Sequence, residues 1–310
     1  MDRQRTLSTA VTCSGIGLHS GGNVTVTIHP APVDHGIVFS RPDKPGKQRV
    51  RAHASKVGGT NFATTLIGDN YIIGTIEHLM AALNGHGVDN ALVEVDGDEM
   101  PIMDGSAAAF SYLIDSAGIA EQAAPRKYIQ ILKPIIVSEN CKRVALLPAD
   151  GFAVTYEIAF PHPMIRTQRF DILLTPESFR RELSNARTFG FLSDLNMMRD
   201  AGLANGGSLE NAIVIGNYSV LNKGGLRYPD EFVRHKVLDA LGDLYLAGYP
   251  ILGRFHAQKS GHALNHKLVT RLLEDTDSWR LVEGRPARRT QKAVPFAAET
   301  ANPRRLFREM

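Results

Sequence analysis

The chain has 310 residues, a formal net charge of +3 and 43% apolar residues. These values exclude a disordered, collagen-like or low-complexity chain, which would be more polar or more biased in composition. The near-neutral charge argues against a dedicated nucleic-acid binder, and the length predicts about two domains.

The first clear element is a strand at 23–29, where apolar and polar residues alternate with the period of a half-buried strand. Pro30 and Pro32 are expected to end it. Further strands are predicted at 37–40, 91–95, 129–137, 144–147 and 154–158. Helices are predicted at 75–83, 107–117, 176–184, 229–247 and 264–273. Thr75 and Asp230 are the expected N-caps, and Gly85 is expected to stop the first helix.

The order of these elements predicts an α+β fold of two similar halves. Each half is expected to be an α/β sandwich in which a mixed sheet packs on two main helices. Residues 121–125 are the predicted linker, which divides the chain into domains at 1–122 and 126–284. The segments 77–83 and 235–241 are weakly similar, which is a hint of duplication.

The two cysteines, Cys13 and Cys141, are too few and too far apart for a disulfide scaffold, which indicates a reducing compartment. The N-terminus lacks the apolar core of a signal peptide, and apolar runs are shorter than the roughly 18 residues of a membrane span. We therefore expect a soluble, cytoplasmic protein without a transmembrane segment.

One predicted helix carries His235, Asp239 and Asp243, each four residues after the last. This spacing places the three side chains on one stripe of the helix, where the histidine and first aspartate can reach one metal ion. The alternative is a solvated face with a local histidine–aspartate hydrogen bond. Because a chain of this size folds without a metal staple, we expect any metal site to be functional.

A second predicted helix begins with adjacent Glu77 and His78 and is otherwise largely apolar. A buried carboxylate beside a buried imidazole is costly unless both are paired. His78 would complete a set of two histidines and one aspartate, which is typical of catalytic zinc. Glu77 would then take a proton from water; the alternative is a Glu–His pair at a buried helix start.

His262 follows a glycine just before the last predicted helix, where the ring can be exposed on a turn. Asp243 could hydrogen-bond this ring and raise its pKa. By itself His262 carries little weight, because the chain has 11 histidines.

Taken together, the motifs resemble the UDP-3-O-acyl-N-acetylglucosamine deacetylases, the zinc amidases of lipid A biosynthesis in Gram-negative bacteria. The resemblance covers about residues 4–282. It is carried by six segments in the same order: 13–21, 75–79, 101–107, 186–191, 231–239 and 259–265. Each segment alone is weak evidence for the family, but six segments in the same order identify it specifically.

The resemblance implies that His78, His235 and Asp239 bind zinc, although iron(II) suits the same ligands. It implies that Glu77 is the general base, and that His262 is a cationic partner oriented by Asp243. The remaining residues that it places in the site are Thr188 at the oxyanion, Lys236 near the substrate, Phe160 on the uracil, Phe189 at the substrate, and Leu195, Ser208, Leu209 and Val214 along an acyl passage. It also implies an active site between the two α/β domains.

The chemistry implied is hydrolysis of the substrate's N-acetyl group to acetate and a free amine. Either Glu77 or His262 could supply the proton to the leaving amine. The rival classes are a zinc amidohydrolase for another acylated amino sugar, a non-catalytic carbohydrate- or protein-binding module, and a nucleic-acid protein. The last is suggested by the C-terminal charge alone.

Residues 285–310 hold seven basic and two acidic side chains, a net charge of +5, which leaves −2 for residues 1–284. We expect this tail to be a basic, disordered extension. A weak contact with an anionic membrane surface is the alternative, since basic clusters gain about 1 kcal/mol per residue there.

Overall fold

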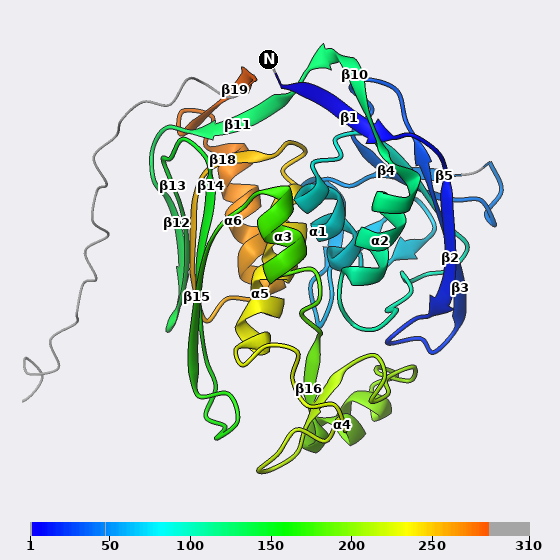
Figure 1. Cartoon of the computed structure of the whole chain (residues 1–310), viewed down its shortest axis with the longest axis vertical. Helices are drawn as coiled ribbons and strands as arrows, with labels where there is room; N and C mark the ends of the chain where they lie inside the picture. Colours follow the sequence, from blue (N-terminus) through cyan, green and yellow to red (C-terminus); the bar gives the residue numbers. More distant parts are fainter. Residues whose placement is uncertain (1, 47, 285–310) are drawn as a thin grey trace, which may run out of the picture.

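The computed structural model describes residues 2–46 and 48–284. It has a mixed α+β fold in which two large sheets lie on opposite sides and most of the helices lie between them (Figure 1). One continuous cluster of buried apolar side chains joins the inner faces of both sheets to these helices. The basic tail at 285–310 lies outside the described residues.

The first sheet has the strand order β2-β3-β9-β4-β5. In β3 the buried side chains are Val24, Val26 and Ile28, which confirms the period-two pattern predicted there. Strand β9 is central, antiparallel to β3 and parallel to β4. The bounds are β2 Val11–Ile16, β3 Asn23–Pro30, β4 Ile37–Arg41, β5 Gln48–Arg51 and β9 Ala91–Val95.

The second sheet has the order β12-β13-β18-β11-β19, and β14 pairs with both β15 and β18. Its central strand, β18, was not predicted. The predicted strand at 129–137 is two strands, β11 and β12. The bounds are β11 Lys127–Ile131, β12 Ile135–Glu139, β13 Lys142–Leu147, β14 Phe152–Ala159, β15 Thr167–Leu173, β18 Ile251–Gln258 and β19 Trp279–Glu283.

The predicted linker at 121–125 is wrong as a description of local structure. These residues belong to strand β10 (Ile119–Pro125), which pairs antiparallel with β1 (Arg3–Leu7). The described residues also form two smaller sheets, β6-β7-β8 and β16-β17, and two short 3-10 helices, η1 and η2. The bounds are β6 Val57–Gly59, β7 Thr65–Ile67, β8 Ile72–Ile73, β16 Phe189–Phe191, β17 Ile213–Ile215, η1 Ala54–Lys56 and η2 Leu192–Asp194.

The helices are α1 Glu77–His86, α2 Ala108–Ala117, α3 Pro176–Glu182, α4 Leu195–Asp200, α5 Glu231–Tyr245 and α6 His262–Glu274. Helices α1 and α5 pack against each other in the middle of the molecule, and α6 packs against α5 (Figure 1). Among the described helices, none has the length and apolarity that crossing a membrane requires.

The predicted ends of α1 are corrected by the backbone. Thr75 does not cap the helix: its φ is 55°, and its hydroxyl donates to Glu99 Oε1 at 2.9 Å. Gly85 lies inside the helix, and Gly87, at a φ of 74°, forms the left-handed C-cap. Asp230 precedes α5, yet its carboxylate accepts from Arg234 rather than from the helix backbone.

Candidate metal centre and active site

The site is built where the start of α1 meets the middle of α5. A glycine allows this contact: a Cβ on Gly242 would lie 2.2 Å from the carbonyl oxygen of Glu77. With hydrogen in its place, the two backbones approach closely, and the first side chains of α1 lie over the polar stripe of α5. That stripe is buried, so the alternative of a solvated face is wrong.

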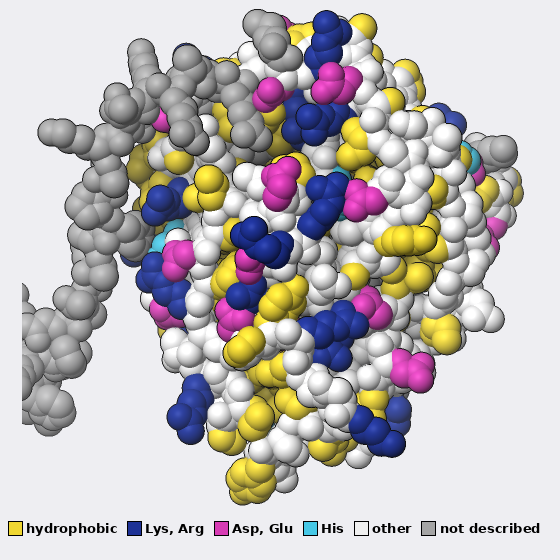
Figure 2. Space-filling model, in the orientation of Figure 1, with side chains coloured by type: hydrophobic (Ala, Val, Ile, Leu, Met, Phe, Trp, Pro, Cys, Tyr) yellow, Lys and Arg dark blue, Asp and Glu magenta, His cyan; other side chains and the backbone are white. Residues whose placement is uncertain are grey.

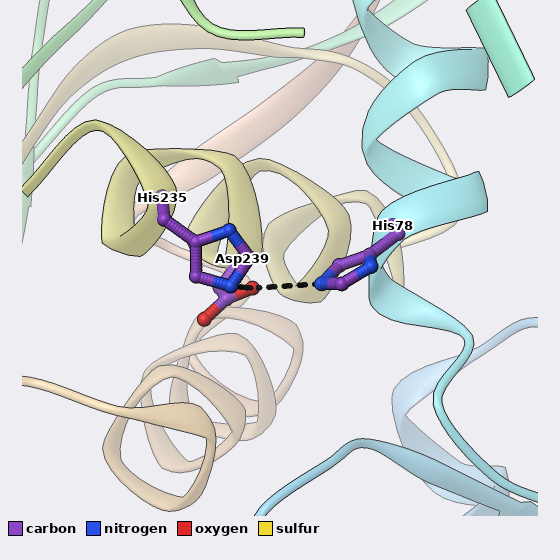
Figure 3. Close-up of side chains that lie close together, drawn as sticks. All are labelled: His78, His235 and Asp239. Carbon is purple, nitrogen blue, oxygen red and sulfur yellow. Dashed lines mark ion pairs between the residues drawn. The ribbon is translucent and has the colours of Figure 1, made fainter. Parts of the chain in front are cut away.

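His78 from α1 and His235 and Asp239 from α5 point toward one another (Figure 3). One ligand atom from each lies within 4.8 Å of the others. Asp239 Oδ1 lies 3.2 Å from Nε2 of His235 and 3.6 Å from Nε2 of His78. No more than 4% of any of the three side chains is exposed.

The chemistry of these donors fits a divalent metal. The backbone carbonyl of Ala186 can only accept, so at 3.1 Å it fixes the proton of His235 on Nδ1 and leaves Nε2 free for a metal. Burial lowers the pKa of His235 to about 3, which keeps the ring neutral. Asp239 Oδ1 has no hydrogen-bond donor among the described residues. A cation would satisfy this buried acceptor.

Lys236 engages the other oxygen of the same aspartate. Its ammonium donates to Asp239 Oδ2 at 2.8 Å, so one carboxylate oxygen faces the histidines and the other faces the lysine. Lys236 also lies 5.7 Å above the ring centroid of Phe189. The lysine predicted near the substrate is therefore adjacent to Asp239 of the candidate metal cluster and to Phe189, a second predicted site residue.

Glu77 is 3% exposed, and burial raises the pKa of its carboxyl group. The backbone N–H of Thr64 donates to its Oε2 at 3.1 Å, which orients the side chain. The other oxygen, Oε1, lies 3.9 Å from Nε2 of His262. His262 Nε2 also lies 3.8 Å from Asp239 Oδ2, so this histidine borders both Glu77 and the candidate metal cluster.

His262 is the first residue of α6 and is 8% exposed, so the expectation of an exposed turn is wrong. Its Nδ1–H donates to Asp243 Oδ2 at 3.0 Å, which confirms the predicted contact between the two residues. Burial opposes a charged ring, but the paired carboxylate outweighs it and raises the pKa of His262 to about 9. The histidine is therefore cationic at neutral pH.

Two residues to which the sequence analysis gave no role complete this network. The hydroxyl of Thr64 donates to Asp243 Oδ1 at 2.6 Å, and the amide of Asn265 donates to Oδ2 at 2.9 Å. Thr64 thus contacts both Glu77 and Asp243. Asn265 lies one helical turn after His262, on the same face of α6. A polar residue at that spacing is the sequence signal that could have identified it.

The structure also brings the predicted oxyanion and acyl-passage residues together at one cavity of about 330 Å³. The predicted residues in its lining are Thr188, Phe189, Leu195, Ser208, Leu209 and Val214. The lining is mainly apolar. Five large apolar side chains in the same part of the chain are exposed: Leu192, Met197, Leu209, Tyr218 and Leu221. Figure 2 shows apolar side chains gathered at the end of the molecule where Figure 1 places α4.

Phe160 lies beside this cavity and is not part of its lining. Its ring centroid is 5.9 Å from the centroids of both Phe189 and Phe191. Phe189 in turn packs 5.0 Å from Phe232 of α5. An aromatic cluster therefore links Phe160, the predicted uracil contact, to α5, which carries two of the three candidate metal ligands.

This arrangement defines a class of protein: an α+β protein with a buried two-histidine, one-aspartate cluster beside a carboxylate and a cationic histidine has the donor set of a metal-dependent hydrolase. Comparison with known proteins identifies the family. Residues 4–274 match the family model of UDP-3-O-acyl N-acetylglycosamine deacetylase. The chain belongs to this family.

Relatives named UDP-3-O-acyl-N-acetylglucosamine deacetylase align over nearly the whole chain. The protein of Myxococcus xanthus is 52% identical over 288 residues, which cover 93% of this chain and 91% of the relative. Those of Teredinibacter turnerae and Pseudomonas entomophila are 48% and 49% identical over 284 residues, which cover 91% of this chain and 94% of each relative.

Proposed function

We propose that this protein hydrolyses the N-acetyl group of UDP-3-O-acyl-N-acetylglucosamine, releasing acetate and the free 2-amino sugar nucleotide in lipid A biosynthesis. One observation carries the proposal: in a chain of this family, Glu77 and His262 lie 3.9 Å apart beside the cluster of His78, His235 and Asp239. General base, cation and metal ligands thus converge from α1, α5 and α6.

His78, His235 and Asp239 would hold the metal, which in this family is zinc; iron(II) would suit the same ligands. When bound, zinc supplies Lewis acidity that activates water and polarises a carbonyl. Lys236 holds the second oxygen of Asp239, which leaves one oxygen for the metal. Ala186 holds the His235 ring in the tautomer that coordinates.

The protein's own groups move the protons. Glu77 accepts a proton from water as the water oxygen bonds to the acetyl carbonyl carbon. Cationic His262, held by Asp243, and Thr188 stabilise the negative charge that develops on the carbonyl oxygen. The carbon–nitrogen bond then breaks as the amine receives a proton from Glu77 or His262. The products are acetate and the amine.

The substrate's other parts occupy the surfaces next to this centre. The apolar cavity receives the acyl chain, with Leu195, Ser208, Leu209 and Val214 along its wall. Phe160 stacks on the uracil. Phe189 contacts Phe160 and lines the cavity, so it lies between the uracil contact and the acyl contact. The depth of the cavity sets the acyl length that fits, which a series of chain lengths would measure.

We further propose that residues 1–122 and 126–284 are two α/β domains related by duplication, with the site at their interface. Each contributes one large sheet and two main helices, α1 and α2 in the first and α5 and α6 in the second. The weakly similar segments 77–83 and 235–241 lie on α1 and α5, the two helices that meet at the site.

The test is replacement of Glu77 by Gln in a purified, zinc-loaded protein. The amide is nearly isosteric and can still accept the N–H of Thr64, but it cannot take a proton. We expect normal zinc content and a kcat lower by about 10²–10⁴-fold, the usual contribution of a general base. Acetate release at the wild-type rate would refute the assignment of Glu77.

A further inference from the structure

The segment at 186–189 lies along the first two turns of α5. It carries the carbonyl that orients His235, the predicted oxyanion residue Thr188, and the ring of Phe189. Through hydrogen bonds and ring contacts it touches Glu231, Phe232, His235 and Lys236 of the helix. Glu231 and His235 are one helical turn apart, as are Phe232 and Lys236, so the four positions form two neighbouring rows on one side of α5.

Glu231 and Arg187 form the firmest of these contacts. Glu231 is 0% exposed, and its carboxylate accepts four hydrogen bonds. Oε1 accepts from the backbone N–H and the Nε of Arg187, at 3.0 and 2.9 Å. Oε2 accepts from Nη2 of Arg187 at 3.1 Å and from the backbone N–H of Arg227 at 2.6 Å. Such a two-pronged, charge-assisted contact fixes geometry as well as distance.

Arg187 stands between two residues that face the site. On one side, the carbonyl of Ala186 accepts from Nδ1 of His235 at 3.1 Å. On the other, Thr188 lines the apolar cavity, and its backbone N–H donates to Gly105 at 2.7 Å. Because Glu231 binds the backbone N–H of Arg187 as well as its guanidinium, it restrains the peptide units that carry both neighbours.

We propose that Glu231 and Arg187 are positioning residues whose buried ion pair locks the 186–188 segment onto α5, and so sets both the orientation of the His235 ring and the place of Thr188. Neither residue touches the reacting atoms. The effect on Thr188 rests on the proposed function, whereas the effect on His235 concerns metal binding and is measured without substrate.

A pair that only stabilised the fold would behave differently. Arg126 and Asp89 provide the comparison: their side chains are 9% and 11% exposed and lie 2.8 Å apart. Like Glu231, Asp89 also accepts a backbone N–H, that of Arg5 at 2.9 Å. None of these contacts includes a residue of the 186–189 segment or a metal ligand, so Asp89→Asn is a matched control.

The experiment compares Glu231→Gln, Arg187→Lys and Asp89→Asn. Zinc affinity is measured by competition with a chelator in the absence of substrate, and kcat and KM are measured on the zinc-loaded proteins. We expect Glu231→Gln to weaken zinc binding by about 10–100-fold, as loss of a partner of a ligating histidine does. Its kcat falls while KM changes little, because Thr188 acts at the oxyanion.

Arg187→Lys keeps the positive charge but loses the two-pronged guanidinium contact, so we expect a smaller loss of zinc affinity and kcat. This variant tests the proposal if Glu231→Gln does not fold. Asp89→Asn should lower the melting temperature and leave zinc affinity unchanged. The proposal is overturned if Glu231→Gln and Arg187→Lys lose stability as the control does yet bind zinc as tightly as wild type. Wild-type protein that binds zinc without releasing acetate would contradict the proposed function instead.

Discussion

Glu77 and His262 both have a raised pKa, but the causes differ. Burial raises the pKa of the Glu77 carboxyl group, which makes it a stronger base. Burial opposes the charge on His262, and the carboxylate of Asp243 outweighs it. With a pKa of about 9, His262 keeps its proton at neutral pH. In the proposed mechanism, Glu77 therefore accepts a proton while His262 carries positive charge.

The basic limb of the pH profile tests this division. Because the pKa of His262 is raised from 6.5 to about 9, its cation predominates at neutral pH and is lost as the pH rises through about 9. We expect kcat/KM to fall through the same range. In His262→Ala, kcat should drop by about 10²–10⁴-fold and this limb should disappear. An unchanged basic limb would remove His262 from the cationic role.

Helical spacing allowed His235, Asp239 and Asp243 to be predicted as one polar stripe, because residues on one face of a helix recur in sequence. Thr64 could not be predicted this way. It lies in a loop and contacts Asp243 across 179 residues, and a lone threonine in a loop has no pattern. Only the tertiary fold brings it to both Glu77 and Asp243.

At the scale of elements, the strands β3, β4, β9, β13 and β14 could be predicted, but β18 could not. Strand β18 alternates between buried and more exposed residues from Gly253 to Gln258, but two of its buried positions are Gly253 and Ala257, which have low strand propensity, so the pattern is weak. The 121–125 segment was assigned as a linker for a similar reason. Its small and polar residues suit an edge strand beside β1 as well as they suit a linker.

The crossing of α1 and α5 predicts the effect of Gly242→Ala. The added methyl group would lie 2.2 Å from the backbone oxygen of Glu77, so α1 must shift. Overpacking of this kind costs about 1–3 kcal/mol. Displacement of Glu77 and His78 should lower kcat by about 10²-fold, since such losses follow shifts near 1 Å. Urea unfolding and initial rates measure the two effects.

Gly85→Ala, near the C-terminal end of α1, is the control, because Glu77 and His78 lie at the other end of that helix. Its Cβ would lie 2.3 Å from the ring of Phe179, away from the metal ligands. It should be destabilised to a similar extent and still deacetylate after zinc loading. Equal activity in both variants would show that the close approach at Gly242 does not set the site geometry.

At the scale of the whole molecule, every group of the proposed site lies within residues 2–284, whereas residues 285–310 carry a net charge of +5. Deletion of 285–310 is therefore expected to leave kcat and KM unchanged. If the tail contacts an anionic surface, the deletion should abolish salt-sensitive binding to vesicles containing anionic lipid. Salt-sensitive DNA binding lost on the same deletion would instead support the nucleic-acid alternative.

The central claim is that the cluster of His78, His235 and Asp239 serves metal-dependent deacetylation. The most direct measurement is acetate release from UDP-3-O-acyl-N-acetylglucosamine before chelation, after chelation, and after zinc is added back. The account predicts turnover that is lost with the metal and restored by stoichiometric zinc, with one free amine per acetate. Full turnover by protein shown to be free of metal would contradict it.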